Sequence, residues 1–322
     1  MTNPTPSGAT AAPEASTPSG APAVTSAASA EPAVSRVARI AAIATTVAAA
    51  VLTGLYLWHM LLRAQPLDAT ASESGSLLLH HPAAAGTAIV LAIAASVIAA
   101  SYVGRSLRRF GTPLLLGLGL LWGMGAPVVV GQVEWLDPMS PAGAVAGPVI
   151  EEVVKASLLV GVALLAGRLI ASPVRGALLG WAVGLGFMLT ENLQYFLNFL
   201  VYKPEGSGDG WIAVAVRSVS TLTGGHYVYT ALVGLAIGAA LARGGRLRLV
   251  GATAAGLGLA AVVHVAANMT PLAAIVLLVI TILLARRIRR AATREATPTP
   301  EAAPAPESDP ASAATVRDSV DR

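Results

Sequence analysis

Two adjacent glutamates and a lysine, Glu151, Glu152 and Lys155, interrupt a run of apolar residues. Residues three or four positions apart are neighbours on a helix surface, so Lys155 can pair with either glutamate. The two glutamates point about 100° apart around such a helix. One of them can therefore be neutralised by the lysine while the other projects elsewhere. The glutamate that is not paired with the lysine can act as a general base on water or as a metal ligand.

Three further polar clusters lie inside apolar stretches downstream. Glu191 shares a helical stripe with Phe187 and Tyr195, and His226 directly follows two glycines. His264 and Asn268 are four residues apart and so also share a helix face. Each cluster contains a side chain that can ligate a metal or transfer a proton.

The composition places these clusters in a membrane protein. Of the 322 residues, 55% are hydrophobic and only 12% are charged, whereas soluble domains carry about 25% charged residues. The absence of cysteine excludes disulfides, thiolate metal sites and a cysteine nucleophile. An ionisable group inside a bilayer costs roughly 2.5–3.5 kcal/mol on insertion scales, so each one needs a partner or a function.

The apolar segments predict an all-α, polytopic helix bundle of about eight transmembrane helices. A span needs roughly 20 apolar residues. The sixth segment is too long for one span, and Gly224 and Gly225 predict a break, with 211–222 near the interface and 224–242 crossing. The expected segments are 38–62, 83–104, 112–134, 144–168, 174–200, 211–242, 248–269 and 271–290.

Arginines concentrate on alternate sides of these spans, which predicts that both termini are cytoplasmic. The same topology accounts for the net charge of +4, so no nucleic-acid partner is implied. Residues 1–35 are rich in Ala, Pro and Ser, and residues 293–322 in Pro, Ala and Glu. Neither segment can bury an apolar core, so we expect two disordered tails around a bundle at 36–292.

With the termini inside, all four clusters fall in the outer half of the membrane at about 1.5 Å per residue. Agreement in depth predicts one shared polar site. Two imidazoles and a carboxylate can hold Zn²⁺ with an open position for water, as in His/Glu catalytic zinc sites. A metal-free version is equally open, in which one glutamate activates water while a histidine or Asn268 donates to the oxyanion.

The four clusters, in order and on successive spans, resemble the motifs of the PrsW family of intramembrane proteases, distant relatives of the type II CAAX prenyl proteases and bacteriocin-processing membrane proteases. The resemblance covers about residues 112–270, which would form the catalytic core. His226 and His264 are followed by Tyr-Val-Tyr and Val-Ala-Ala-Asn, where the family more often has His-Ala-Leu-Phe and His-Ala-Leu-Trp-Asn. These departures leave the proposed ligands in place.

The resemblance implies hydrolysis of single-pass membrane proteins in a bacterial cytoplasmic membrane, by site-one-type cleavage of a substrate such as an anti-sigma factor. Carried over residue by residue, it implies catalytic roles for Glu151 and Glu152, with Glu152 favoured as general base. It also implies that Glu191, His226 and His264 are metal ligands or oxyanion stabilisers, and that Asn268 supports His264.

Two other functions remain open from the residues alone. A proton-coupled transporter could use the glutamates and histidines as a relay, although no internal repeat of the kind found in transporters is visible. A membrane scaffold could use the same polar site only to lock its helices together.

Overall fold

The computed structural model describes residues 81–110, 112–133, 140–201, 209–270 and 272–296, together with positions 44, 47, 48, 51 and 53–55. All of them lie in the compact unit Ser35–Arg322. The expected N-terminal tail at 1–35 lies outside the described residues, as do nearly all of the expected first span at 38–62 and the C-terminal tail beyond Ala296.

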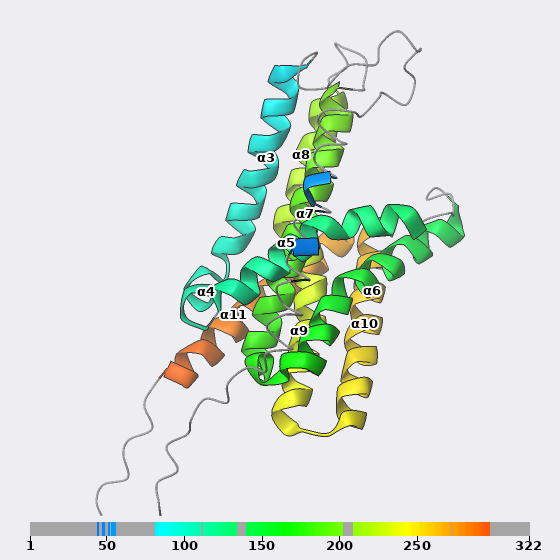
Figure 1. Ribbon diagram of the computed structural model, residues 1–322. Helices are drawn as coiled ribbons and strands as arrows, with labels where there is room; N and C mark the ends of the chain where they lie inside the picture. Colours follow the sequence, from blue (N-terminus) through cyan, green and yellow to red (C-terminus); the bar gives the residue numbers. More distant parts are fainter. Residues whose placement is uncertain are drawn as a thin grey trace, which may run out of the picture. The chain divides into compact units, whose positions relative to one another are not determined.

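The regular elements of the described residues are all helical, as predicted (Figure 1). They are α3 (Pro82–Ser101), α4 (Gly104–Phe110), α5 (Pro113–Val133), α6 (Pro141–Ala166), the 3₁₀ turn η2 (Gly167–Ile170), α7 (Pro173–Val201), α8 (Asp209–Thr223), α9 (His226–Arg243), α10 (Arg246–Met269) and α11 (Leu272–Ala296).

Six segments of the described residues are long and apolar enough to cross a membrane. They are Pro82–Ser101, Pro113–Val130, Pro141–Ile170, Pro173–Leu200, Gly210–Arg243 and Arg246–Met269. These match the expected second to seventh spans. The expected eighth span corresponds to α11, which is not among the six, since arginines begin at Arg286 and shorten its apolar stretch.

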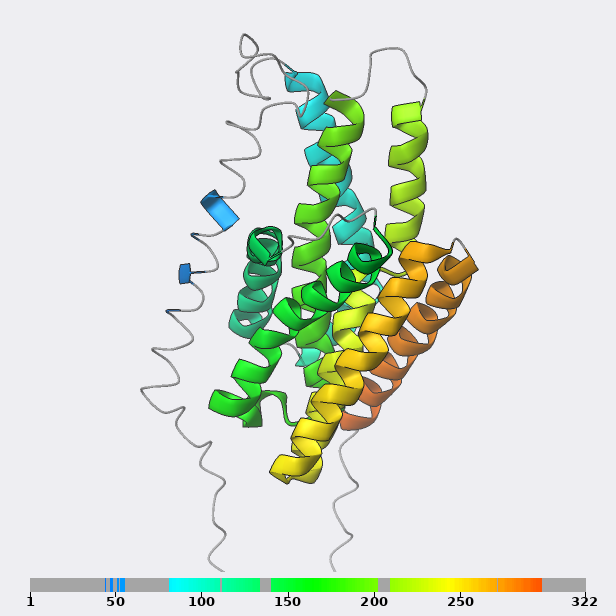
Figure 2. The ribbon, with the colours of Figure 1, turned by 90° about the vertical axis from the view of Figure 1, so that its right-hand side faces the viewer.

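Helix α7 lies at the centre of the bundle, and α3, α5 and α9 surround it (Figures 1 and 2). Glycines every four residues allow α7 and α9 to approach closely. A Cβ atom at Gly176, Gly180 or Gly184 would collide with the α9 backbone at Gly234, Thr230 and His226 respectively. Small residues of this kind let membrane helices pack backbone to backbone. The close approach at Gly184 fixes the first turn of α9, where His226 lies.

The predicted break at Gly224 and Gly225 is confirmed, because α8 ends at Thr223 and α9 begins at His226. Gly224 has φ of 151°, a backbone conformation that side chains with a Cβ rarely adopt. Hydroxyl groups of one residue just after α3, one in α9 and one in α11 then satisfy the last carbonyls of α8. Tyr227 donates to Thr221 O at 3.0 Å, Tyr102 donates to Leu222 O at 3.0 Å, and Thr281 donates to Thr223 O at 2.9 Å. The break between α8 and α9 is therefore stabilised by specific side-chain hydrogen bonds.

Candidate active site

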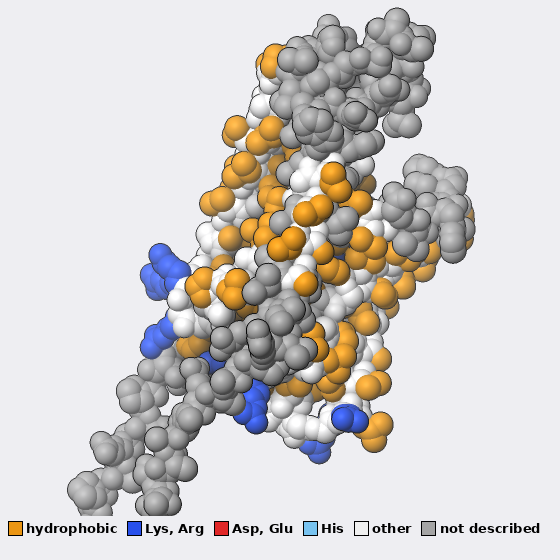
Figure 3. Space-filling view, viewed as in Figure 1, with side chains coloured by type: hydrophobic (Ala, Val, Ile, Leu, Met, Phe, Trp, Pro, Cys, Tyr) orange, Lys and Arg blue, Asp and Glu red, His pale blue; other side chains and the backbone are white. Residues whose placement is uncertain are grey.

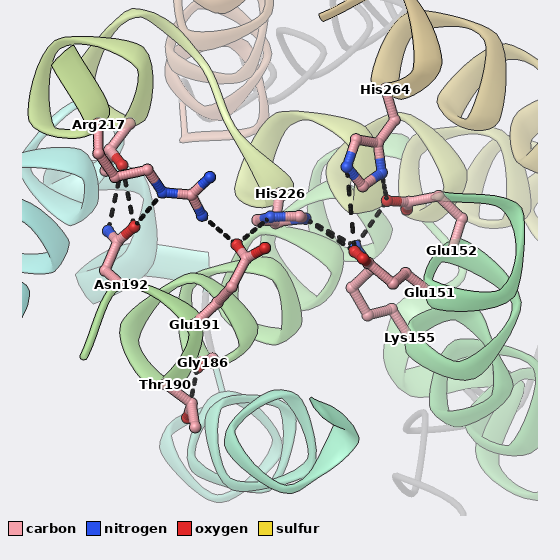
Figure 4. Close-up of polar contacts among 11 residues, drawn as sticks. Glu151, Glu152, Lys155, Gly186, Thr190, Glu191, Asn192, Arg217, His226 and His264 are labelled. Carbon is pink, nitrogen blue, oxygen red and sulfur yellow. Dashed lines mark hydrogen bonds and ion pairs between the residues drawn. The ribbon is translucent and has the colours of Figure 1, made fainter. Parts of the chain in front are cut away.

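Four helices bring the predicted site residues together in the interior of the bundle (Figure 4). Helix α6 contributes Glu151, Glu152 and Lys155, and α7 contributes Glu191. His226 is the first residue of α9, and His264 lies in the last two turns of α10. Ion pairs and hydrogen bonds join these side chains across the helices, so the charged and imidazole groups of the four clusters form one polar group.

Glu152 is the glutamate that Lys155 neutralises. Its Oε1 lies 2.6 Å from the lysine Nζ, against 3.5 Å for Oε2 of Glu151. The same Oε1 accepts a hydrogen bond from Nδ1 of His264 at 3.1 Å. The side chain of Glu152 is only 1% exposed, whereas that of Glu151 is 14% exposed. The residue favoured from the sequence as general base is thus committed to a buried ion pair, and Glu151 is the more accessible carboxylate.

His226 is held from both sides of its ring. Its Nε2 lies 2.6 Å from Oε2 of Glu191, and its Nδ1 lies 2.8 Å from Nζ of Lys155. A carboxylate accepts hydrogen bonds and an ammonium donates them. Nε2 therefore donates to Glu191, and Nδ1 is the nitrogen that carries the lone pair.

Each imidazole consequently has its lone-pair nitrogen near the same carboxylate. The N–H of His264 is used by Glu152 and that of His226 by Glu191, which leaves Nε2 and Nδ1 respectively as acceptors. These two nitrogens lie 3.9 Å and 3.7 Å from Oε2 of Glu151. We call Glu151, His226 and His264 the Glu–His–His cluster.

The Glu–His–His cluster has the donor set of a catalytic metal site. Its three ligand atoms all lie within 4.8 Å of one another. Two histidines and one carboxylate are a known zinc-binding combination, and such histidines normally donate their other N–H to a carboxylate, as both do here. The resemblance implied that Glu191 is an acidic metal ligand or an oxyanion stabiliser. In the structure the carboxylate grouped with the two histidines is that of Glu151, and Glu191 bonds to His226 and Arg217. Lys155 donates to His226 Nδ1 in this structure, so the ammonium and a metal are alternatives at that nitrogen.

Aromatic rings line the site and pack against the two imidazoles. The ring of Phe187 lies 4.6 Å from that of His226, and the Lys155 ammonium lies 4.2 Å above Phe187. Tyr229 stacks on His264 with centroids 4.7 Å apart. The two imidazole rings lie 4.8 Å apart and nearly perpendicular. These contacts restrict ring rotation in addition to the hydrogen bonds.

A cavity of about 520 Å³ opens onto both histidines. Its lining comes from α7, α8, α9, α10 and α11, and it includes Asn268. Among the described residues, no hydrogen bond joins Asn268 to His264, which bonds to Glu152. Asn268 lies one turn further along α10, where it faces the cavity. The structure thus places Asn268 in the wall of the cavity, with no hydrogen bond to the residues of the polar group among those described.

Arg217 is a site residue that sequence reasoning does not single out. It lies in α8, pairs with Glu191 and donates from Nε to Oδ1 of Asn192 at 2.9 Å. A signal is present in the sequence, since an arginine in the middle of the apolar segment 210–223 requires a partner. The expectation that 211–222 lies near the interface hides that signal, because an arginine at the membrane surface needs no buried partner.

Comparison with known proteins gives one family. A family model described as "PrsW family intramembrane metalloprotease" matches residues 83–286, more than half of the chain. The match includes α5 to α10 and all of the residues of the Glu–His–His cluster. No curated protein and no solved structure matches the chain.

Proposed function

The chain belongs to the PrsW family of intramembrane metalloproteases and is a peptidase, and we propose that it cleaves single-pass membrane proteins at the Glu–His–His cluster. The observation that carries this proposal is that two imidazole nitrogens with lone pairs lie 3.7 Å and 3.9 Å from Oε2 of Glu151. Such an arrangement is what a water-activating centre requires. The buried ion pair of Glu152 explains why Glu151 takes this place.

We assign Glu151 as the group that accepts the proton of the attacking water, in place of Glu152. The water oxygen adds to the peptide carbonyl carbon, and its proton passes to the carboxylate. Glu151 then returns the proton to the leaving amine nitrogen as the C–N bond breaks. Glu152 keeps His264 oriented, and Glu191 does the same for His226.

The residues that would hold a metal are Glu151, His226 and His264. We propose Zn²⁺, which would act as a Lewis acid on the water and on the scissile carbonyl. A carboxylate has two oxygens, so ligation through one leaves the other for the proton. Lys155 and Phe187 then exclude bulk water from the inner side of the site.

We further propose that both termini are cytoplasmic and that the cluster faces the outer half of a bacterial cytoplasmic membrane. Figure 3 shows Lys and Arg side chains toward one end of the bundle, where α4 and the α9–α10 turn carry arginines. His226 begins the 18-residue helix α9, which ends at Arg243. At 1.5 Å per residue that separation is about 26 Å, most of a ~30 Å hydrocarbon core. Such a depth suits site-one cleavage, for example of an anti-sigma factor.

The proposal is tested in lipid vesicles with isotopic water. Purified protein or its Glu151→Gln variant is fused with membranes from cells that lack the protein, in H₂¹⁸O. If the protein hydrolyses peptide bonds, new C-terminal carboxylates labelled with ¹⁸O should form with the unaltered protein and should not form with Glu151→Gln. Equal labelling with both proteins would contradict the role of Glu151, and labelling with neither would contradict the proposed substrates.

A further inference from the structure

Helix α8 forms one wall of the cavity that leads to the histidines. Residues from both of its ends line that cavity, from Ile212 to Thr223, and Arg217 lies between them. Apart from Asp209, Arg217 is the only ionisable residue of α8. Arg217 itself also lines the cavity, but its side chain is only about one quarter exposed.

Three contacts fix the guanidinium of Arg217. It pairs with Oε2 of Glu191 through Nη2 and donates from Nε to Oδ1 of Asn192 at 2.9 Å. It also lies over the ring of Tyr195, 4.4 Å from the centroid. Asn192 is in turn held by Thr221, to which its Nδ2 donates at 3.1 Å. A planar guanidinium with two directed bonds holds its partners in a defined geometry.

The oxygen that Arg217 binds is the one that orients His226. Oε2 of Glu191 accepts from the guanidinium and from Nε2 of His226. Figure 4 shows the continuous series of contacts from Arg217 through Glu191 to His226 and on to the α6 glutamates. A free Glu191 side chain could rotate and leave Nε2 without an acceptor. The ring would then lose the bond that directs Nδ1 toward Glu151.

We propose that Arg217 is a positioning residue, which holds the metal-binding nitrogen of His226 in place through Glu191. The proposal rests on the proposed function, since it concerns the same site. It makes α8 part of the catalytic centre, although α8 contributes no member of the Glu–His–His cluster. Groups that orient metal-binding histidines typically change metal affinity or activity by 10–100-fold when removed.

Metal affinity gives a readout that needs no substrate. Zn²⁺ alone is titrated into purified Arg217→Ala, Arg217→Lys and the matched control Arg175→Ala, an exposed arginine near the start of α7. We expect Arg217→Ala to weaken Zn²⁺ binding by roughly 10–100-fold. The Zn²⁺ affinity of Arg217→Lys should lie between those of Arg217→Ala and the unaltered protein. Lysine can pair with Glu191, but it cannot also bind Asn192 in the same plane. Arg175→Ala should bind as the unaltered protein does, and equal affinity in Arg217→Ala would overturn the proposal.

Chemical rescue separates positioning from general support of the fold. Guanidinium ion at low, non-denaturing concentration should partly restore Zn²⁺ binding to Arg217→Ala, because it can occupy the vacated position beside Glu191. It should not rescue Glu191→Gln, which lacks the charged acceptor. Lost affinity that guanidinium leaves unchanged, accompanied by a lower unfolding midpoint, would show that Arg217 only stabilises the fold and would overturn the proposal.

Kinetics distinguish this proposal from the proposed function. On a substrate whose cleavage depends on Glu151, Arg217→Ala should lower kcat by roughly 10–100-fold and leave KM within about threefold. A loss confined to KM would instead make Arg217 a substrate contact and overturn the proposal. If Zn²⁺ affinity depends on Arg217 but the protein cleaves no peptide bond, the positioning role stands and the proposed function fails. If the unaltered protein cleaves the substrate and Arg217→Ala equals it in both Zn²⁺ affinity and kcat, the proposed function stands and the positioning role fails.

Discussion

Nδ1 of His264 donates to Oε1 of Glu152 at 3.1 Å, and this bond turns the opposite ring nitrogen toward Glu151. The same carboxylate oxygen lies 2.6 Å from the ammonium of Lys155. Glu152 is therefore a structural partner of two other site residues. Its neighbour Glu151, one position earlier in α6, faces the nitrogens that can bind water or metal.

The division of roles between the two glutamates predicts different consequences of the same substitution. Glu151→Gln should lower the cleavage rate by roughly 10²–10⁴-fold, because it removes the proton acceptor. It should leave the unfolding midpoint almost unchanged. Glu152→Gln should lower the rate by only about 10–100-fold. It should also destabilise the protein by about 3 kcal/mol, because Lys155 loses its closest buried counter-charge.

Cleavage kinetics and thermal unfolding of the two variants check this prediction. If Glu152→Gln folds normally and loses the greater share of activity, the assignment of the base returns to Glu152. The neutral amide of that variant would then have to keep the His264 ring in place without a negative charge.

The cluster predicts one Zn²⁺ per chain, bound with the help of both histidines. His226→Ala and His264→Ala should each lose the metal, because each removes one of three donors. His81→Ala is the matched control, since His81 is an exposed residue just before α3. Metal content of the purified proteins gives the answer. Full metal occupancy in His264→Ala would rule out the proposed donor set.

The approach of α7 to α9 predicts that a small substitution away from the chemistry disables the site. A Cβ at Gly184 would meet the backbone of His226 and Tyr227. Gly184→Ala should therefore shift the first turn of α9, lower activity at least about tenfold and cost roughly 1–3 kcal/mol in stability. Gly161→Ala in α6 is the control, because a Cβ there meets nothing within 4 Å. Equal activity and stability of the two variants would contradict the role of this contact.

The sequence predicted which polar clusters meet, and helix geometry explains why. Ionisable residues within membrane spans face the interior of the bundle and pair with one another, so those at a common depth in neighbouring spans meet in one site. The order of helices and the break before His226 follow from apolar length and from two consecutive glycines. The peptidase family also agrees with the resemblance seen in the motifs, and it favours hydrolysis over the transporter alternative.

The side-chain contacts within the site could not be predicted from the sequence. Spacing shows which residues share a face of one helix, but it does not show how far that helix is rotated against its neighbours. Glu151 and Glu152 differ by only about 100°, so modest rotation of α6 decides which one meets the histidines and which one meets Lys155. Arg217 reaches Glu191 only because α8 packs along α7, and apolar length alone does not distinguish such packing from a position at the membrane surface.

New protein N-termini in cells test the central claim most directly. Cells that make the unaltered protein or Glu151→Gln at equal levels are compared under conditions that include envelope stress. The account predicts N-termini that appear only with the unaltered protein and that map within or just outside the outer part of single-pass segments. Identical sets of N-termini in the two cultures would contradict proteolysis by the Glu–His–His cluster.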